Sequence, residues 1–172
     1  MPLNRDFFLI AIAVLCCQRT FELYIAQKNE TWLRRNNAIE FGSRHYRFII
    51  ILHVCFILSL IIEGWKNGPS LISWWPTPAM LLLCSQILRY WCIISLGKLW
   101  NTKILVIPGM KRIRNGPYRF MPHPNYLVVV LEFLLLPLLF ASWFTLVWAS
   151  TANAFILSKR IKQEEEALAS LI

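Results

Sequence analysis

Two polar segments near the C-terminal end of the chain carry residue types that suit a charged small molecule. The first is the proline-rich run from Gly116 to Tyr126, which contains a histidine, an asparagine and two tyrosines. The second follows the last apolar run and places Arg160 four residues before the paired acids Glu164 and Glu165. Residues four apart share one face of a helix. Two polar segments at the same end of a hydrophobic hairpin are the pattern expected of a binding site at a membrane surface.

The first polar segment has the features of a helix start. Pro124 fits the first helical position, where its missing N–H does no harm, so His123 is expected at or near the cap. The free N–H groups of that first turn would suit a carboxylate or a phosphate. Two simpler interpretations stay open: His123, Asn125 and Tyr126 only cap a helix at an interface, and Arg160 only pairs locally with Glu164 at the end of a solvated helix.

The composition predicts that these segments are positioned by membrane helices. The 172 residues are 57% hydrophobic and 16% charged, whereas a soluble domain usually has about 25% charged residues and about 45–50% apolar ones. The formal net charge of +9 suggests nucleic acid as an alternative partner. That alternative is disfavoured because little polar surface lies outside the apolar segments.

Five apolar segments are long enough to cross a bilayer, which takes roughly 20 residues. They are 6–26, 46–62, 78–97 and two that share the stretch 124–158, with a turn near Pro137 to Ser142. We therefore expect an all-α integral membrane protein with five transmembrane helices. Residues 1–97 would form a three-helix membrane region, and residues 98–172 would form a loop, a C-terminal helical hairpin and a tail.

The distribution of basic residues predicts the orientation of the chain. Lysines and arginines gather after the first span (Lys28 to Arg47), after the third span (Lys98 to Arg119) and in the tail after Ser158. The other segments hold only Arg5 and Lys66. Because positive residues are retained on the cytoplasmic side, we expect a multi-pass cell-membrane protein with its N-terminus outside and its C-terminus inside. Both polar segments then meet at the cytoplasmic face.

Four charged residues fall inside the expected spans, where a charge is costly and usually faces a partner or a polar cavity. Arg19 and Glu22 are expected to form a local ion pair, and Glu132 is expected to pair with Arg89 across the bundle. The same residues would suit a small transporter or channel, in which Arg89 and Glu132 line a path. A non-catalytic membrane assembly subunit is a further alternative.

The sequence contains no pattern of a metal or nucleotide site. The three histidines are scattered, and the five cysteines lie in apolar runs without a Cys-x-x-Cys pair. No glycine-rich nucleotide loop occurs either. We expect no metal, and any nucleotide-like cofactor must be held in another way.

The order and spacing of the two polar segments resemble the isoprenylcysteine carboxyl methyltransferase family. The matching motifs are Gly116 to Arg119, His123-Pro124-Asn125-Tyr126, an apolar hairpin, and Arg160 followed by Glu164-Glu165. Upstream, Leu96-Gly97, Trp100 and Pro108-Gly109 also fit, so that the resemblance covers about the last 80 residues. Members are integral-membrane enzymes that transfer a methyl group from S-adenosylmethionine.

The resemblance implies a role for particular residues. Arg160 would bind an anionic substrate and act in catalysis together with Glu164. The residues implied in cofactor binding are Met110, Lys111, Arg112, Ile113, Tyr118, His123, Pro124, Asn125, Tyr126, Glu164 and Glu165. The substrate implied is a lipophilic acid or enol, taken from the membrane and its lipids, that is methylated on oxygen.

Three positions depart from the family pattern and concern the acceptor more than the cofactor. Pro122 stands in place of an arginine, Val128 in place of a glycine, and Lys103 in place of a glutamine. The short loops look like those of bacterial relatives that methylate lipid-like polyketides such as alkylpyrones rather than prenylated peptides. A basic rim would attract the acidic head group: Lys103, Lys111, Arg112 and Arg114.

Overall fold

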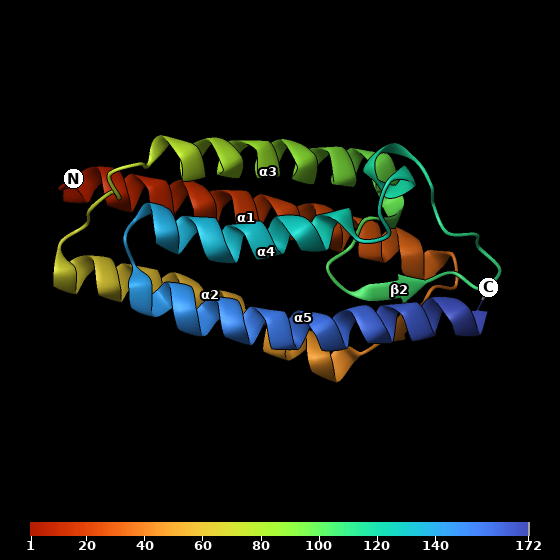
Figure 1. Cartoon of the computed structure of the whole chain (residues 1–172). Helices are drawn as coiled ribbons and strands as arrows, with labels where there is room; N and C mark the ends of the chain where they lie inside the picture. The colour runs from red at the N-terminus through yellow and green to blue at the C-terminus, as the bar shows by residue number, and fades with distance from the viewer. Residues whose placement is uncertain (172) are drawn as a thin grey trace.

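The computed structural model describes residues 1–171 and shows, within that range, five α-helices that run side by side along one axis (Figure 1). They are α1 (Arg5–Arg35), α2 (Ser43–Asn67), α3 (Pro76–Leu96), α4 (Pro124–Leu139) and α5 (Trp143–Leu171). The N-terminus and the C-terminal end of α5 lie at opposite ends of the bundle (Figure 1). The expected helical architecture is thus confirmed.

Three of the helices are long and apolar enough to cross a membrane: α1, α2 and α3 with its short 3₁₀ extension η1 (Gly97–Leu99). Helix α4 is apolar, but its 16 residues give a length of about 24 Å, less than the roughly 30 Å of a hydrocarbon core. Large apolar side chains such as Phe7, Leu83 and Val147 point outward. An outer surface of this kind suits lipid rather than water.

The C-terminal hairpin has the expected form, with one correction to its turn. Helix α4 begins at Pro124 as predicted, and the connection to α5 is Phe140–Ser142. Pro137 was expected in the turn but lies inside the last part of α4. A proline there leaves the carbonyl of the residue four positions earlier without its usual donor. The Ser150 hydroxyl donates to that carbonyl, on Phe133, at 3.0 Å.

The end of the bundle near the N-terminus is closed by contacts between distant segments. The Leu3 amide donates to the Pro69 carbonyl at 2.8 Å, and the Ile72 amide donates to the Leu139 carbonyl at 3.3 Å. Glu63 of α2 accepts from the Thr145 amide at 2.9 Å and so satisfies a donor in the first turn of α5. These bonds anchor the hairpin turn at the end opposite the polar segments.

The other end is held by a small antiparallel ribbon that the sequence analysis did not predict. Strand β1 (Ile39–Phe41) pairs with β2 (Ile104–Val106), and Glu40 lies opposite Leu105. Ala167 and Leu168 of α5 pack against this ribbon. The helical architecture therefore includes two additional three-residue strands. They join the loop after α1, the loop after α3 and the tail at one end.

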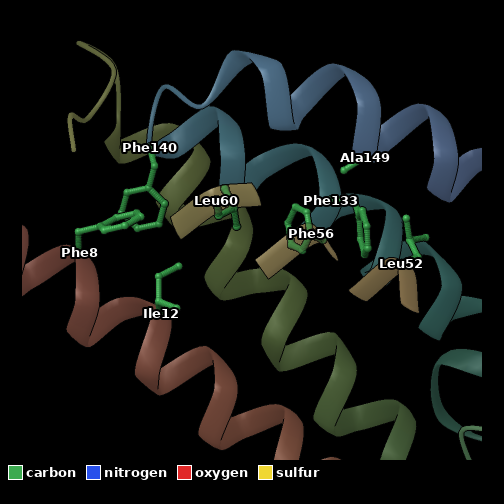
Figure 2. Close-up of a cluster of buried hydrophobic side chains, with 8 residues drawn as sticks. All are labelled: Phe8, Ile12, Leu52, Phe56, Leu60, Phe133, Phe140 and Ala149. Atoms are coloured by element: carbon green, nitrogen blue, oxygen red, sulfur yellow. The ribbon is translucent and has the colours of Figure 1, made fainter. Parts of the chain in front are cut away.

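A cluster of buried side chains from α1, α2, α4, α5 and the hairpin turn forms the main apolar core (Figure 2). Phe56 and Phe133 stack at its centre, with ring centroids 4.3 Å apart. Phe8 meets Phe140 edge to face, with centroids 5.0 Å apart. This packing fixes α2 and α4 relative to each other, and both helices lead directly to the ribbon end.

Candidate functional site

A cavity of about 230 Å³ lies between the helices on the ribbon side of the core. Its walls come from α1, α2, α3, α4, α5 and the segment around β2. Six residues proposed from the sequence line it: Tyr118, His123, Asn125, Tyr126, Arg160 and Glu164. The two polar segments, more than 30 residues apart in the sequence, therefore border the same space.

The Tyr126 hydroxyl links these segments at the mouth of the cavity. It accepts a hydrogen bond from Arg160 Nε at 3.0 Å and donates one to Glu164. The Arg160 guanidinium also lies 5.9 Å from the centre of the Tyr126 ring. Arg160 and Glu164 are thus connected through Tyr126, and no direct ion pair between them occurs within residues 1–171. The local salt bridge considered for the tail is wrong.

A second set of contacts fixes the outer part of the mouth. His123 Nε2 lies 2.6 Å from Glu165 Oε1, and its ring stacks on Tyr126 with centroids 5.1 Å apart. Arg112 donates to both oxygens of Glu165, at 2.9 and 3.2 Å. The hydrogen bonds from Arg112, and then those from His123, hold the pKa of the Glu165 carboxyl below its ordinary value. We call these six residues the mouth cluster: Arg112, His123, Tyr126, Arg160, Glu164 and Glu165.

Arg160 is the buried cation of the mouth cluster, with only 7% of its surface exposed. Its Nη2 donates to the Thr102 carbonyl at 2.6 Å, and its Nε donates to Tyr126. Nη1 makes no hydrogen bond to any residue from 1 to 171, and no carboxylate in that range lies within 4.0 Å of the guanidinium. A buried arginine normally has an acidic partner. Arg160 instead offers unused donors to the cavity.

The start of α4 provides a further unsatisfied group. His123 is the N-cap residue, as expected, but its side chain makes no capping hydrogen bond. Asn125 Oδ1 is buried, lines the cavity, and has no partner within the described residues. Tyr118 faces the same space from the 3₁₀ helix η2 (Gly116–Arg119). Burial, followed by the nearby Cys92 thiol, raises the pKa of Tyr118, so its hydroxyl stays neutral.

The remaining residues implied by the resemblance lie outside the cavity wall. Arg112 and Glu165 reach the wall through their bonds to His123. Met110, Lys111, Ile113 and Pro124 are not among the lining residues. Of the expected basic rim, Lys103 lines the cavity but bonds to Glu30 at 2.8 Å, whereas Lys111 and Arg114 are exposed.

A second group of polar residues lies deeper in the bundle, and we call it the inner cluster. Its members are Gln18, Arg19, Glu22, Gln86, Arg89 and Glu132. Arg19 bonds to Glu22 at 2.7 Å, and Arg89 bonds to Glu22 at 2.9 Å. Both arginines also bond to Glu132. The expected Arg19–Glu22 and Arg89–Glu132 pairs are confirmed, but they form one network that also engages both glutamines.

Three polar positions near the cavity were missed in the sequence. The Thr102 carbonyl accepts from Arg160, while His53 and Asn153 line the cavity between the mouth cluster and the inner cluster. A backbone acceptor carries no sequence signal. Asn153, however, is a polar residue within an apolar run, seven positions before Arg160. That spacing puts the two side chains on one helix face and is a signal that was available.

Comparison with known proteins relates the same C-terminal region to a protein family. The sequence profile of the isoprenylcysteine carboxyl methyltransferase (ICMT) family matches residues 78–170, more than half of the chain. The match begins at the start of α3, upstream of the region in which the motifs were recognised. No solved structure matches the chain significantly.

Two similar bacterial proteins extend the likeness over nearly the full length. The uncharacterized protein YpbQ of Bacillus subtilis is 47% identical over 161 residues, which cover 94% of this chain and 96% of the relative. An uncharacterized protein of Haemophilus influenzae is 29% identical over 166 residues, which cover 96% of each chain. The sequence likeness therefore extends beyond residues 78–170 into the N-terminal part of the chain.

Proposed function

Because the chain belongs to the isoprenylcysteine carboxyl methyltransferase family, a family of membrane methyltransferases, we propose that it uses S-adenosylmethionine to methylate an oxygen of a lipophilic acid or enol. The mouth cluster would be its active site. An alkylpyrone-type polyketide is the acceptor class that we favour, with a prenylcysteine carboxylate as the second candidate.

The observation that carries this proposal is the unused hydrogen-bonding capacity of Arg160. Its guanidinium is buried at the cavity and has no carboxylate within 4.0 Å in residues 1–171. A carboxylate or enolate oxygen would supply the missing negative charge and accept from Nη1. Arginine suits such an acceptor because it stays protonated and presents a planar set of donors.

The residues at the mouth fit the chemical groups of the cofactor. The helix N-terminus at Pro124 and the side chain of Arg112 suit its carboxylate. Glu164 suits its hydroxyls or its cationic centre, and the buried, unpartnered Asn125 Oδ1 suits an amino group. Tyr118 and His123 would provide the flanking walls.

In the proposed reaction the protein positions and stabilises charge rather than removing a proton. The cofactor, when bound, would supply a methyl group on a cationic sulfur, and the carbon–sulfur bonding electrons would remain on sulfur when the methyl group is transferred to the acceptor oxygen. Arg160 holds the ionised acceptor oxygen, and Tyr126 fixes the guanidinium through its Nε. An acid or enol that is already ionised needs orientation more than it needs a base.

We further propose that all five helices cross the membrane and that the mouth cluster faces the cytoplasm. The α4–α5 hairpin runs from the ribbon end to the N-terminal end, where Ile72 bonds to Leu139. The loops and tail at the ribbon end contain most of the basic residues, which supports a cytoplasmic position for that end. A lipophilic acceptor would then enter from the bilayer with its head group near the mouth.

The transporter alternative has less support. It requires Arg89 and Glu132 to line a path, yet Glu132 does not line the cavity, and three side chains donate to it: Arg19, Gln86 and Arg89. A carboxylate that is fully occupied by internal donors has little capacity left for a solute.

The test is binding of S-adenosylmethionine to the purified full-length protein, followed by transfer of its labelled methyl group. We expect binding, and we expect Glu164→Gln to weaken it by about 10- to 100-fold, as is typical for loss of a charged hydrogen-bond partner. Labelled methyl should appear in an alkylpyrone or a prenylcysteine acceptor.

Glu166→Gln is the matched control because Glu166 is exposed on the same helix and lies 3.9 Å from Lys162. Its cofactor affinity should equal that of the wild type. No measurable binding of S-adenosylmethionine to the wild-type protein would defeat the proposal.

A further inference from the structure

The cavity continues beyond the mouth cluster into a part that Arg160 and Glu164 do not account for. This part, which we call the inner chamber, is lined by His53, Asn153 and the cavity-facing members of the inner cluster: Arg19, Glu22 and Arg89. Asn153 and Arg160 lie on one face of α5. Seven residues of rise separate them by about 10 Å along the helix axis.

Asn153 has an unusual position for an amide. Only 4% of its surface is exposed, it lines the cavity, and it makes no hydrogen bond to any residue from 1 to 171. A buried polar side chain is normally hydrogen-bonded, because its desolvation is otherwise uncompensated. An asparagine that is kept in an apolar helix without an internal partner is suited to bind a polar group of a ligand.

His53 offers a complementary group on the facing helix α2. Its Nδ1 lies 2.8 Å from the Ile49 carbonyl, and since a carbonyl can only accept, Nδ1 is the donor. In the neutral ring this leaves a lone pair on Nε2, which has no partner among the described residues. The edge-to-face contact with Phe133, with centroids 5.1 Å apart, fixes the ring in place.

The charges beside the chamber indicate what kind of group it accepts. Two arginines and two glutamates of the inner cluster balance each other, so the chamber has no surplus charge for a second anion. The asparagine amide can donate to an uncharged carbonyl or hydroxyl oxygen, whereas the lone pair on His53 Nε2 can only accept, and so suits a hydroxyl group.

We propose that the inner chamber binds an uncharged oxygen of the acceptor, separate from the acidic oxygen at Arg160, and thereby selects head groups with two oxygen functions over simple fatty acids. Asn153, whose amide can donate to that oxygen, would be the specificity-determining residue, and His53 would add an acceptor for a hydroxyl group. This inference rests on the proposed methyltransferase function and deepens it: the acceptor is an amphiphile with an acidic oxygen and a second, neutral oxygen in its head.

The experiment compares two ligands that differ in this feature. The first is 4-hydroxy-6-undecylpyran-2-one, which has an acidic enol and a lactone carbonyl. The second is dodecanoic acid, which has a carboxylate alone. Binding of each to the full-length protein saturated with S-adenosylhomocysteine is measured by calorimetry, so that differences in chemical reactivity do not enter.

We expect Asn153→Leu to weaken binding of the pyranone by about tenfold, as is typical for loss of one hydrogen bond in a buried site. The affinity for dodecanoic acid should change by less than about twofold, because this ligand has no second oxygen function to bond with Asn153. His53→Phe keeps the ring contact with Phe133 and removes only the Nε2 acceptor, so it should leave the pyranone affinity unchanged, because a lactone carbonyl cannot donate to Nε2. Thr151→Val is the control, because the Thr151 hydroxyl is exposed and bonds only to the Val147 carbonyl at 2.7 Å; it should leave both ligands unaffected.

The outcomes separate this inference from the function on which it rests. If S-adenosylhomocysteine does not bind to the wild-type protein, the proposed function fails and the inner chamber loses its role with it. If S-adenosylhomocysteine binds but Asn153→Leu affects both ligands equally, or neither, only the inner chamber proposal is overturned. Cofactor affinity that is unchanged in Asn153→Leu and His53→Phe shows that the variants are folded.

Discussion

The inner cluster and the mouth cluster both contain arginines and glutamates, but their charges are paired differently. In the inner cluster, Glu132 and Arg89 are 1% and 2% exposed, and each contacts an opposite charge. In the mouth cluster, Glu165 pairs with Arg112 at the surface, whereas Arg160 is buried without an acidic partner in residues 1–171. The charges of the inner network are paired within the protein, although Arg89 Nε is buried without a hydrogen-bond partner in residues 1–171. Within the same residues, the charges of the mouth cluster are not all paired.

This difference distinguishes the two regions by role. A buried charge that is fully paired holds helices together, and removing one partner leaves the other uncompensated. A buried charge that keeps free donors at a cavity is suited to an outside ligand. The inner cluster should therefore respond to mutation mainly in stability, and the mouth cluster mainly in activity.

The largest effect is expected from Glu132→Gln. It leaves Arg19 and Arg89 with one carboxylate between them, so the free energy of unfolding should fall by about 3–5 kcal/mol. Thermal unfolding of the purified protein measures this. Arg89→Met combined with Glu132→Met restores charge balance and should recover much of the loss. An unchanged unfolding midpoint in Glu132→Gln would contradict a structural role for the inner cluster.

Arg160→Met should have the opposite profile. Since it leaves no carboxylate without a partner, the unfolding midpoint should stay close to that of the wild type. The rate constant kcat/KM for methyl transfer should fall by about 10²- to 10³-fold, the range found when a charge-stabilising donor is removed. Glu166→Gln serves again as the control. If Arg160→Met instead lowers the unfolding midpoint while its folded fraction retains full activity, the roles assigned to the two clusters would be reversed.

A smaller loss is expected from Tyr126→Phe. The substitution keeps the ring that stacks on His123 but removes the hydroxyl between Arg160 and Glu164. Loss of this orienting bond should lower kcat/KM by about 3- to 10-fold, with the fold retained. Steady-state kinetics with varied cofactor and varied acceptor would show whether the substitution changes the KM for the cofactor, the KM for the acceptor or both. Full activity would mean that the link does not position Arg160.

The smallest effect concerns pH and the exposed side of the mouth cluster. Arg112 and His123 lower the pKa of Glu165, so its ionised form contributes stability above the ordinary carboxyl pKa. That contribution is lost as pH falls through the lowered pKa. The difference in unfolding midpoint between wild type and Glu165→Gln should thus be constant at neutral pH and vanish in acid. A difference that grows on acidification would contradict this sign.

The sequence predicted the helices and the meeting of the two polar segments better than the details between them. The helix start at Pro124 was predicted, because proline is tolerated at the first position, whereas the span expected from residue 78 begins two residues earlier, at Pro76. The ribbon of Ile39–Phe41 and Ile104–Val106 was missed because three-residue strands show no alternation and depend on pairing across distant loops.

The candidate site was recognised through its motif, but its connections required the structure. The bond from Arg160 to the Thr102 carbonyl depends on where a loop carries its backbone, which residue types do not determine. The inner chamber depends on the relative rotation of α2 and α5, which brings His53 and Asn153 to one cavity. Helix packing sets that rotation, together with hydrogen bonds between α2 and α5 such as that from the Thr145 amide to Glu63.

The most direct test of the central claim is an experimental structure of the full-length protein with S-adenosylhomocysteine. We expect the ligand at the ribbon end, beside Tyr118, His123 and Glu164, with Arg160 facing the position of the missing methyl group. Ligand density at another place, or density that leaves Arg160 remote from the sulfur, would contradict the assignment of the mouth cluster as the methyltransferase site.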